Sequence, residues 1–243
     1  MIYFVADIHL GLGAGGPAER EARFVTWLRS LQKPDTEAVY LLGDIWDFWY
    51  EYRDVIPREA VRVTAAIIDL LDSGVKVYYI PGNHDVWLYS FWQELGVTVL
   101  PQPQVLELAG KRLLVGHGDG LGGGPWGYRL MLSIFHNRLC QKLFSALHPW
   151  FAFRFGTDWS NSNRRKHGGY VFKGEAEPLY RWCKAECEKA ASAGTPFDIC
   201  LFGHFHDAVD MPVGGARLVV LKDWIDGGVH FASLSQSGDF TVR

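Results

Sequence analysis

The sequence has no large excess of charge of either sign. Its 24 Lys and Arg residues nearly balance its 27 Asp and Glu residues, and the formal net charge is −3. Such a chain has no overall attraction to the phosphates of DNA or RNA, so we expect no nucleic-acid partner. No apolar run approaches the ~20 residues that a membrane-spanning helix needs, and the sequence therefore predicts no transmembrane segment.

Cysteine is scarce. The four cysteines are Cys140, Cys183, Cys187 and Cys200, and no two of them form a C-x-x-C pair. This spacing argues against a structural zinc site, so we interpret the cysteines as reduced core thiols of a cytoplasmic protein. The chain also begins with an apolar run that leads directly to Asp7, and cleavage of a signal peptide would remove both.

Short apolar runs alternate with amphipathic stretches in the first half of the chain. Buried strands are predicted at residues 2–6, 38–42, 75–80 and 113–115, and helices at residues 18–31 and 59–71. This alternation predicts an α/β fold with a mostly parallel sheet. A hairpin is predicted at residues 105–108 and 112–115, and a second sheet from residues 199–202, 218–221, 229–234 and 240–242. We expect one domain over residues 1–243.

Polar motifs follow five of the predicted strands. They are Asp7-Ile8-His9, Gly43-Asp44-Ile45-Trp46-Asp47, Gly82-Asn83-His84-Asp85, Gly116-His117 and Gly203-His204-Phe205-His206. Functional residues of open α/β sheets gather beyond the carboxyl ends of the strands, so these distant motifs are expected to converge in one crevice. One such motif alone is more often structural, but five in this order predict a functional site.

The side chains of these motifs suit a pair of divalent cations. Two carboxylates, one amide carbonyl and four imidazoles are available, from Asp7, His9, Asp44, Asn83, His117, His204 and His206. A mixed set of oxygen and nitrogen ligands favours Mn²⁺, Fe or Zn²⁺ over Ca²⁺ or Mg²⁺. A carboxylate shared between two such cations would support hydrolysis of a phosphate ester or anhydride.

The order of these motifs, from Asp7 to His206, resembles that of the calcineurin-like metallophosphoesterases. The resemblance implies a four-layer α-β-β-α sandwich in which Asp44 bridges two metals. It also implies that one metal is held by Asp7, His9 and His206, and the other by Asn83, His117 and His204. His84 would act on the scissile phosphate as the catalytic residue, and Asp47 and Asp85 would orient the ligands.

An aromatic segment interrupts the strand pattern. Residues 125–165 carry many Trp, Tyr and Phe residues, with Leu and Met at helical spacings, and we predict a helical, apolar cap inserted in the domain. Either these aromatics pack on each other and on the core, or they form a groove for apolar chains. A polar run overlaps the end of the segment. Ser160, Ser162, Asn163, Arg164 and Arg165 are either a solvated loop or, with Asn83, contacts to a diphosphate.

Within this superfamily the chain most resembles the UDP-2,3-diacylglucosamine hydrolases of lipid A biosynthesis. The resemblance rests on Leu41–Asp44 before an aromatic run, on His117–Leu121 before Gly127-Tyr128, and on the apolar insertion that ends at Arg164. It implies an Mn²⁺-dependent hydrolase that yields UMP and 2,3-diacylglucosamine 1-phosphate from a glycolipid nucleotide. It also implies a peripheral location on the cytosolic face of the inner membrane, with no obligate protein partner.

Two alternatives remain at this stage. The chain departs from the best-known branch of that family at His84, where that branch has Arg, so another phosphomonoester or phosphodiester is an alternative substrate. A fold reused as a binding scaffold is a second alternative, which the complete set of seven ligands disfavours. Trp46, Trp49 and Tyr50 are candidates for stacking on uracil, although we expect them in the core.

Overall fold

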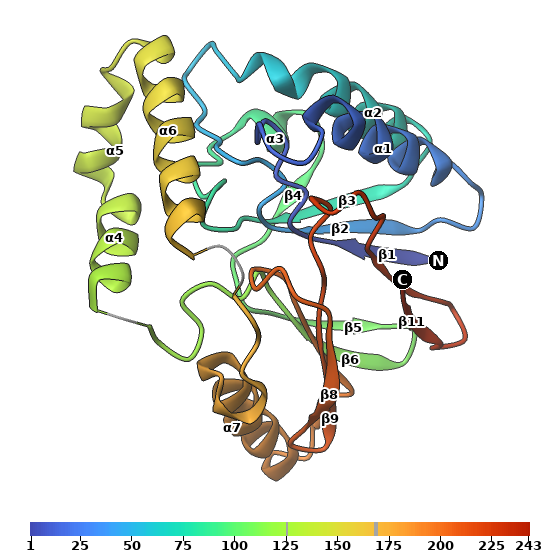
Figure 1. The fold of residues 1–243 in the computed structure, drawn as a ribbon. Coiled ribbons are helices and arrows are strands. Elements are labelled where there is room, and N and C mark those ends of the chain that lie inside the picture. The colour runs from blue at the N-terminus through green and yellow to red at the C-terminus, as the bar shows by residue number, and fades with distance from the viewer. Residues whose placement is uncertain (125, 168–169) are drawn as a thin grey trace.

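The structure is a computed structural model that describes residues 1–124, 126–167 and 170–243, except for the side chains of residues 161–167. Two β-sheets lie face to face in it (Figure 1). The first has the strand order β11-β10-β1-β2-β3-β4. Its strands are β1 (Ile2–Val5), β2 (Ala38–Leu42), β3 (Lys76–Ile80), β4 (Thr98–Val99), β10 (Ala232–Leu234) and β11 (Phe240–Val242). β1 to β4 are parallel, as the alternation of strands and helices predicts.

The second sheet has the order β5-β6-β7-β9-β8. Its strands are β5 (Gln104–Leu108), β6 (Lys111–Val115), β7 (Ile199–Phe202), β8 (Val209–Val213) and β9 (Ala216–Val220). β5 and β6 form the predicted hairpin, and β6, β7 and β9 run parallel to one another. The ends of these three strands therefore point the same way.

The prediction that all of the last strands form the second sheet is wrong for two of them. β10 pairs antiparallel with β1, in the register Ile2↔Leu234, and β11 pairs with β10. This return covers the edge of β1, which would otherwise present unpaired backbone groups to solvent. It also buries Ala232 and Leu234 between the sheets.

Helices cover the two outer faces and complete four layers. α1 (Pro17–Ser30) and α2 (Val61–Asp72) pack on the first sheet, together with the short η1 (Arg58–Ala60) and α3 (Phe91–Glu94). α7 (Pro178–Ser192) packs on the second sheet, after the short η2 (Gly174–Ala176). A cluster of apolar side chains fills the space between the two sheets. The predicted α-β-β-α sandwich is confirmed.

Three further helices stand beside the sandwich. They are α4 (Trp126–His136), α5 (Arg138–Ser145) and α6 (Pro149–His167), drawn in green to yellow at the left of Figure 1. They occupy most of the segment predicted to form a helical insertion, residues 125–165, and α6 continues to His167. Among the described residues, no helix is long and apolar enough to cross a bilayer.

Candidate metal centre

The five motifs meet where their strands end. In the described part of the chain, three groups of His and Asp side chains have ligand atoms within 4.8 Å of one another. One group is Asp7, His9 and His206, and a second is Asp44, His117 and His204. The third joins His9 and Asp44 to His84. Side chains up to 199 positions apart in sequence thus converge at one site, as the strand-end rule predicts.

Asp44 lies between the first two groups. Its Oδ2 is 3.8 Å from Nε2 of His9 and 3.3 Å from Nε2 of His117. In the first group, Oδ1 of Asp7 is 3.6 Å from Nε2 of His9 and 3.8 Å from Nε2 of His206. The Asp44 carboxylate is therefore placed where it can contact two cations at once.

Several buried polar atoms here have no hydrogen-bond partner among the described residues. They include Oδ1 of Asp7, Oδ1 of Asn83 and Nε2 of His117. Leaving a buried polar atom unpaired is unfavourable, so such clusters in native proteins have a reason. All three atoms are of the kind that ligates a divalent cation, and the donor set fits Mn²⁺, Fe or Zn²⁺.

The backbone of the ligand motifs is unusual. Asp7, His9, Asp44, His204 and His206 all have positive φ angles, of 54°, 51°, 50°, 73° and 56°. L-residues adopt this left-handed conformation rarely because the Cβ atom crowds the backbone. Each residue here turns the chain sharply at a strand end, and the turn directs the side chain into the pocket. Strain of this kind clusters at functional sites.

The charged side chains of this cluster shift one another's pKa values. Burial alone would lower the pKa of His117, but the carboxylates of Asp44 and Asp7 raise it well above its usual value. Burial opposes ionisation of Asp44, yet His117 and His84 hold the pKa of its carboxyl well below the usual range. Burial, reinforced by His117, lowers the pKa of His204 to about 4, so that ring is neutral at pH 7.

Hydrogen bonds orient the proposed ligands. Nδ1 of His117 donates to the carbonyl of Leu42 at 2.9 Å, which turns Nε2 toward Asp44. The Asp85 carboxylate accepts from the backbone N–H groups of Gly82 at 2.6 Å and Ile45 at 2.8 Å. Asp85 thus fixes the turn that carries Asp44. Burial and the nearby Asp44 raise the pKa of Asp85 to about 6. Oδ1 of Asp47 lies 3.5 Å from Nδ1 of His9.

His84 lies at the edge of the cluster, facing the helical segment. Its Nδ1 is 2.7 Å from the carbonyl oxygen of Asp47, so this nitrogen carries a proton and donates it. The same nitrogen is 3.5 Å from Oγ of Ser160, a fully buried residue of α6. Nε2 is 3.9 Å from Oδ2 of Asp44. The reactive nitrogen of His84 therefore points into the pocket.

Three contributors were not predicted from the sequence. Nδ1 of His206 donates to Asp223 at 3.0 Å. The buried guanidinium of Arg20 donates to the backbone carbonyls of His9 and Leu12 and holds the loop after β1. The hydroxyl of Tyr128, on α4, is buried without a hydrogen-bond partner among the described residues. Asp223 carries a signal in the sequence because it too follows a buried strand, β9, and Tyr128 belongs to the Gly127-Tyr128 pair that contributes to the family resemblance.

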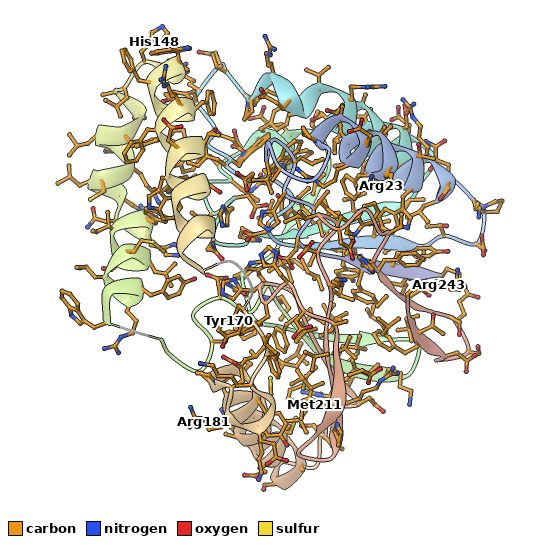
Figure 2. The ribbon with its side chains drawn as sticks, in the orientation of Figure 1. Arg23, His148, Tyr170, Arg181, Met211 and Arg243 are labelled. Atoms are coloured by element: carbon orange, nitrogen blue, oxygen red, sulfur yellow. The ribbon has the colours of Figure 1, made fainter. Side chains whose placement is uncertain are left out.

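Other candidate residues lie elsewhere. Trp46, Trp49 and Tyr50 are at most 1% exposed and pack in the core, so they offer no ring face to a base. His148 lies at the far tip between α5 and α6, as Figure 2 shows, away from the metal centre. The four cysteines are free thiols. Cys183, Cys187 and Cys200 are buried between α7 and the second sheet, as expected for core thiols, whereas Cys140 is only half-buried. The side chains of Ser162, Asn163, Arg164 and Arg165 lie outside the described residues.

An apolar cavity of about 270 Å³ opens between α4, α5, α6 and the body of the protein. Phe48, Trp87, Phe135, Phe144 and Trp159 contribute to its walls. Trp159 links the cavity to the metal centre, because its ring is 6.2 Å from that of His84. The cavity is about twice the ~150 Å³ that takes up a benzene molecule in an engineered protein core, so it has room for part of an alkyl chain.

The family model and the similar proteins agree on one family. The model of the calcineurin-like phosphoesterases matches residues 1–208. The chain is 32% identical over 241 residues to a UDP-2,3-diacylglucosamine hydrolase of Porphyromonas gingivalis, covering 92% of this chain and 90% of that protein. It is 39% identical over 147 residues to the Escherichia coli protein of the same name, covering 59% and 58% of the two chains. The protein belongs to the calcineurin-like phosphoesterase family and is a hydrolase.

Proposed function

We propose that this protein hydrolyses the diphosphate bond of UDP-2,3-diacylglucosamine to UMP and 2,3-diacylglucosamine 1-phosphate. The name of the two relatives supports the substrate. The observation that carries the proposal is the apolar cavity beside His84, since a phosphoesterase acting on a water-soluble nucleotide or a phosphoprotein needs no such cavity. Burying each CH₂ group of an acyl chain there contributes about 0.8 kcal/mol.

We assign the metal ligands from the two groups of side chains. Asp7, His9 and His206 hold one cation, Asn83, His117 and His204 hold the other, and Asp44 contacts both. We propose Mn²⁺ as the native ion. When bound, the cations supply a nucleophile at neutral pH and neutralise charge on the diphosphate.

His84 acts on the phosphoryl oxygens. Its protonated Nδ1 is held by the carbonyl of Asp47, which leaves Nε2 directed at the substrate. The departing sugar phosphate is a weak base, with a second pKa of about 6–7 like that of a phosphorylated side chain, and needs little help from an acid. His84 therefore stabilises developing negative charge. The hydroxyl of Tyr128, which has no hydrogen-bond partner among the residues that the structure describes, is available as a second hydrogen-bond donor to the substrate.

The polar end of α6 binds the diphosphate and sugar in this proposal. Ser160 contacts His84 directly and so lies beside the reacting phosphate. Ser162, Asn163, Arg164, Arg165 and Asn83 complete the proposed substrate contacts. Arg binds phosphate oxygens through two parallel hydrogen bonds, which suits a diphosphate.

The outer surface of the helical segment rests on the cytosolic face of the inner membrane. Large apolar side chains are exposed there, among them Trp126, Leu139, Trp150 and Phe151 at 55–73%. Arg129, Arg138, Lys142 and Arg154 are exposed on the same helices, against the single acidic Asp158. Apolar and aromatic residues beside cations are the combination that binds an anionic bilayer surface without spanning it.

The direct test is incubation of the purified protein with UDP-2,3-diacylglucosamine and Mn²⁺, with release of UMP as the readout. Asp44→Ala should abolish release, because one substitution removes a ligand from both cations. UDP-N-acetylglucosamine, which has the diphosphate but no long acyl chains, is the control substrate and should be hydrolysed far more slowly. Efficient hydrolysis of simple phosphomonoesters or phosphodiesters, without UMP from the lipid, would favour the alternative substrate class.

A further inference from the structure

His84 is held from two sides by residues whose chain neighbours line the apolar cavity. On one side, the carbonyl of Asp47 accepts the proton of Nδ1 at 2.7 Å, and Phe48 follows directly. On the other side, Oγ of Ser160 is 3.5 Å from the same nitrogen, and Trp159 precedes it. Phe48 and Trp159 both form walls of the cavity.

These two walls belong to different parts of the molecule. Phe48 lies in the loop after β2, and Trp159 lies on α6. Phe48 contacts Phe144 and Phe153 of the helical segment at ring-centroid distances of 6.3 and 6.2 Å, and Trp159 contacts Phe135 at 5.4 Å. The cavity is therefore the seam along which the helices meet the metal-binding body.

An alkyl chain in the cavity adds contacts to the sides of Phe48 and Trp159 that face it, and these contacts restrict the positions of both rings further. Because one peptide bond separates each wall residue from a residue that touches His84, fixing the walls also fixes the imidazole. The proposed ligand His206 is held differently, because its Nδ1 donates to Asp223 on the β9–β10 loop.

We infer that an acyl chain in this cavity positions His84 for the chemical step, with Phe48 and Trp159 as positioning residues. The inference rests on the proposed function and adds to it that the lipid chain raises the rate of catalysis in addition to affinity. The acyl chain is remote from the reacting bond, but its binding energy then lowers the activation barrier for cleavage of that bond. Substrates with shorter chains should react more slowly even when fully bound.

The test is the single-turnover rate with excess Mn²⁺-loaded protein, on UDP-diacylglucosamines of decreasing chain length. This rate excludes product release. We expect it to fall roughly tenfold to 100-fold between chains that reach the cavity and chains that do not, the scale of misplacing a catalytic group. A rate at saturation that is independent of chain length overturns the inference. Absence of UMP from every lipid substrate would instead refute the proposed function.

A pair of variants separates filling of the cavity from lipid binding. Ile134 lines the cavity and is 48% exposed, whereas Leu130 on the same helix is 46% exposed and does not line it. Ile134→Trp should partly fill the cavity and raise the single-turnover rate on a short-chain substrate. Leu130→Trp should leave that rate unchanged. Equal rates in the two variants and the parent protein would contradict the inference.

A readout without catalysis uses the metal-free protein and 1-octanol as the probe. The ring resonances of ¹⁵N-labelled His84, assigned by comparison with His84→Gln, should shift and sharpen as the alcohol fills the cavity. Those of His230, which bonds to Asp226 on the β9–β10 loop, should not change. A response of the Trp159 indole without any response of His84 would refute the coupling.

Discussion

The Asp223 carboxylate accepts a hydrogen bond from Nδ1 of His206 at 3.0 Å, while Nε2 of the same ring faces Asp7 at 3.8 Å. The next residue, Trp224, donates its backbone N–H to the carbonyl of Asp7 at 3.2 Å. The loop after β9 thus supports two proposed ligands of one cation. It lies beyond residue 208, where the family model ends.

Loss of the Asp223 carboxylate should weaken that cation site. We expect Asp223→Ala to lower Mn²⁺ affinity about 10- to 100-fold, the usual effect of losing a carboxylate that orients a ligand His. Titration calorimetry measures the affinity. Asp226→Ala is the matched control, because Asp226 pairs with Lys222 and His230 but with none of the proposed ligands. Equal affinity in the two variants would show that Asp223 does not orient His206.

Metal binding should release a proton from His117. Asp44 and Asp7 outweigh the effect of burial and raise the pKa of His117 well above its usual value in the metal-free protein, so the ring keeps its proton to a higher pH than a free imidazole does. A metal ligand must be neutral, and Mn²⁺ affinity should therefore rise with pH up to that raised pKa.

The same shift stabilises the metal-free fold below the unfolded-state pKa of about 6.5, and this contribution disappears as pH rises through the folded-state pKa. Calorimetry in two buffers of different ionisation enthalpy measures the released proton. His117→Gln should release less. Identical heats in both buffers at pH 7 would mean that His117 is already neutral.

His84→Arg should keep much more activity toward the UDP-lipid than His84→Ala. Arg can stabilise charge on phosphoryl oxygens but cannot donate a proton, since its pKa exceeds about 12. The ratio of kcat/KM between the two variants is the measurement. Equal, near-total loss in both would identify His84 as a general acid and favour a substrate with a more basic leaving group.

Gly156 is a point of close approach between α6 and Phe48 of the body. A methyl group added at this position would overlap the ring of Phe48. We expect Gly156→Ala to destabilise the protein by about 1–3 kcal/mol, the usual range for overpacking, and to lower Tm by several degrees. Gly127→Ala on α4 is the control, since no atom of the described residues outside its chain neighbours and its own helix lies within 4 Å of the added methyl group. An unchanged Tm for Gly156→Ala would mean that α6 moves aside freely.

The exposed aromatics of α6 should carry membrane binding. Trp150 and Phe151 are 55% and 63% exposed, whereas Phe153 packs against Phe48 and Tyr52. We therefore expect Trp150→Ser/Phe151→Ser to reduce flotation with anionic liposomes. Val61→Ser is the control, because Val61 is 62% exposed but lies on α2. Binding that survives the double substitution would remove the helical segment as the membrane contact.

The strand ends and their polar motifs could be predicted from the sequence because they depend on local patterns. The apolar run before Asp7 and the glycine before Asp44 each indicate a buried strand that is followed by a sharp turn. The return of β10 to β1 could not be predicted in this way, because the pairing of Leu234 with Ile2 depends on which edge remains open after the sheet has formed. Asp223 was missed because its contact with His206 forms only in the folded chain, and Tyr128 because the burial of its hydroxyl depends on how the chain packs around α4.

The left-handed backbone at five of the seven proposed ligands has a consequence for attempts to make this protein more robust. A glycine at Asp7, His9, Asp44, His204 or His206 would relieve roughly 1 kcal/mol of conformational strain at each position. Directed evolution for heat tolerance alone would therefore favour substitution of the proposed metal ligands. Selection that also requires catalytic activity would retain them. At these five positions the backbone conformation lowers the stability of the folded state and preorganises the site.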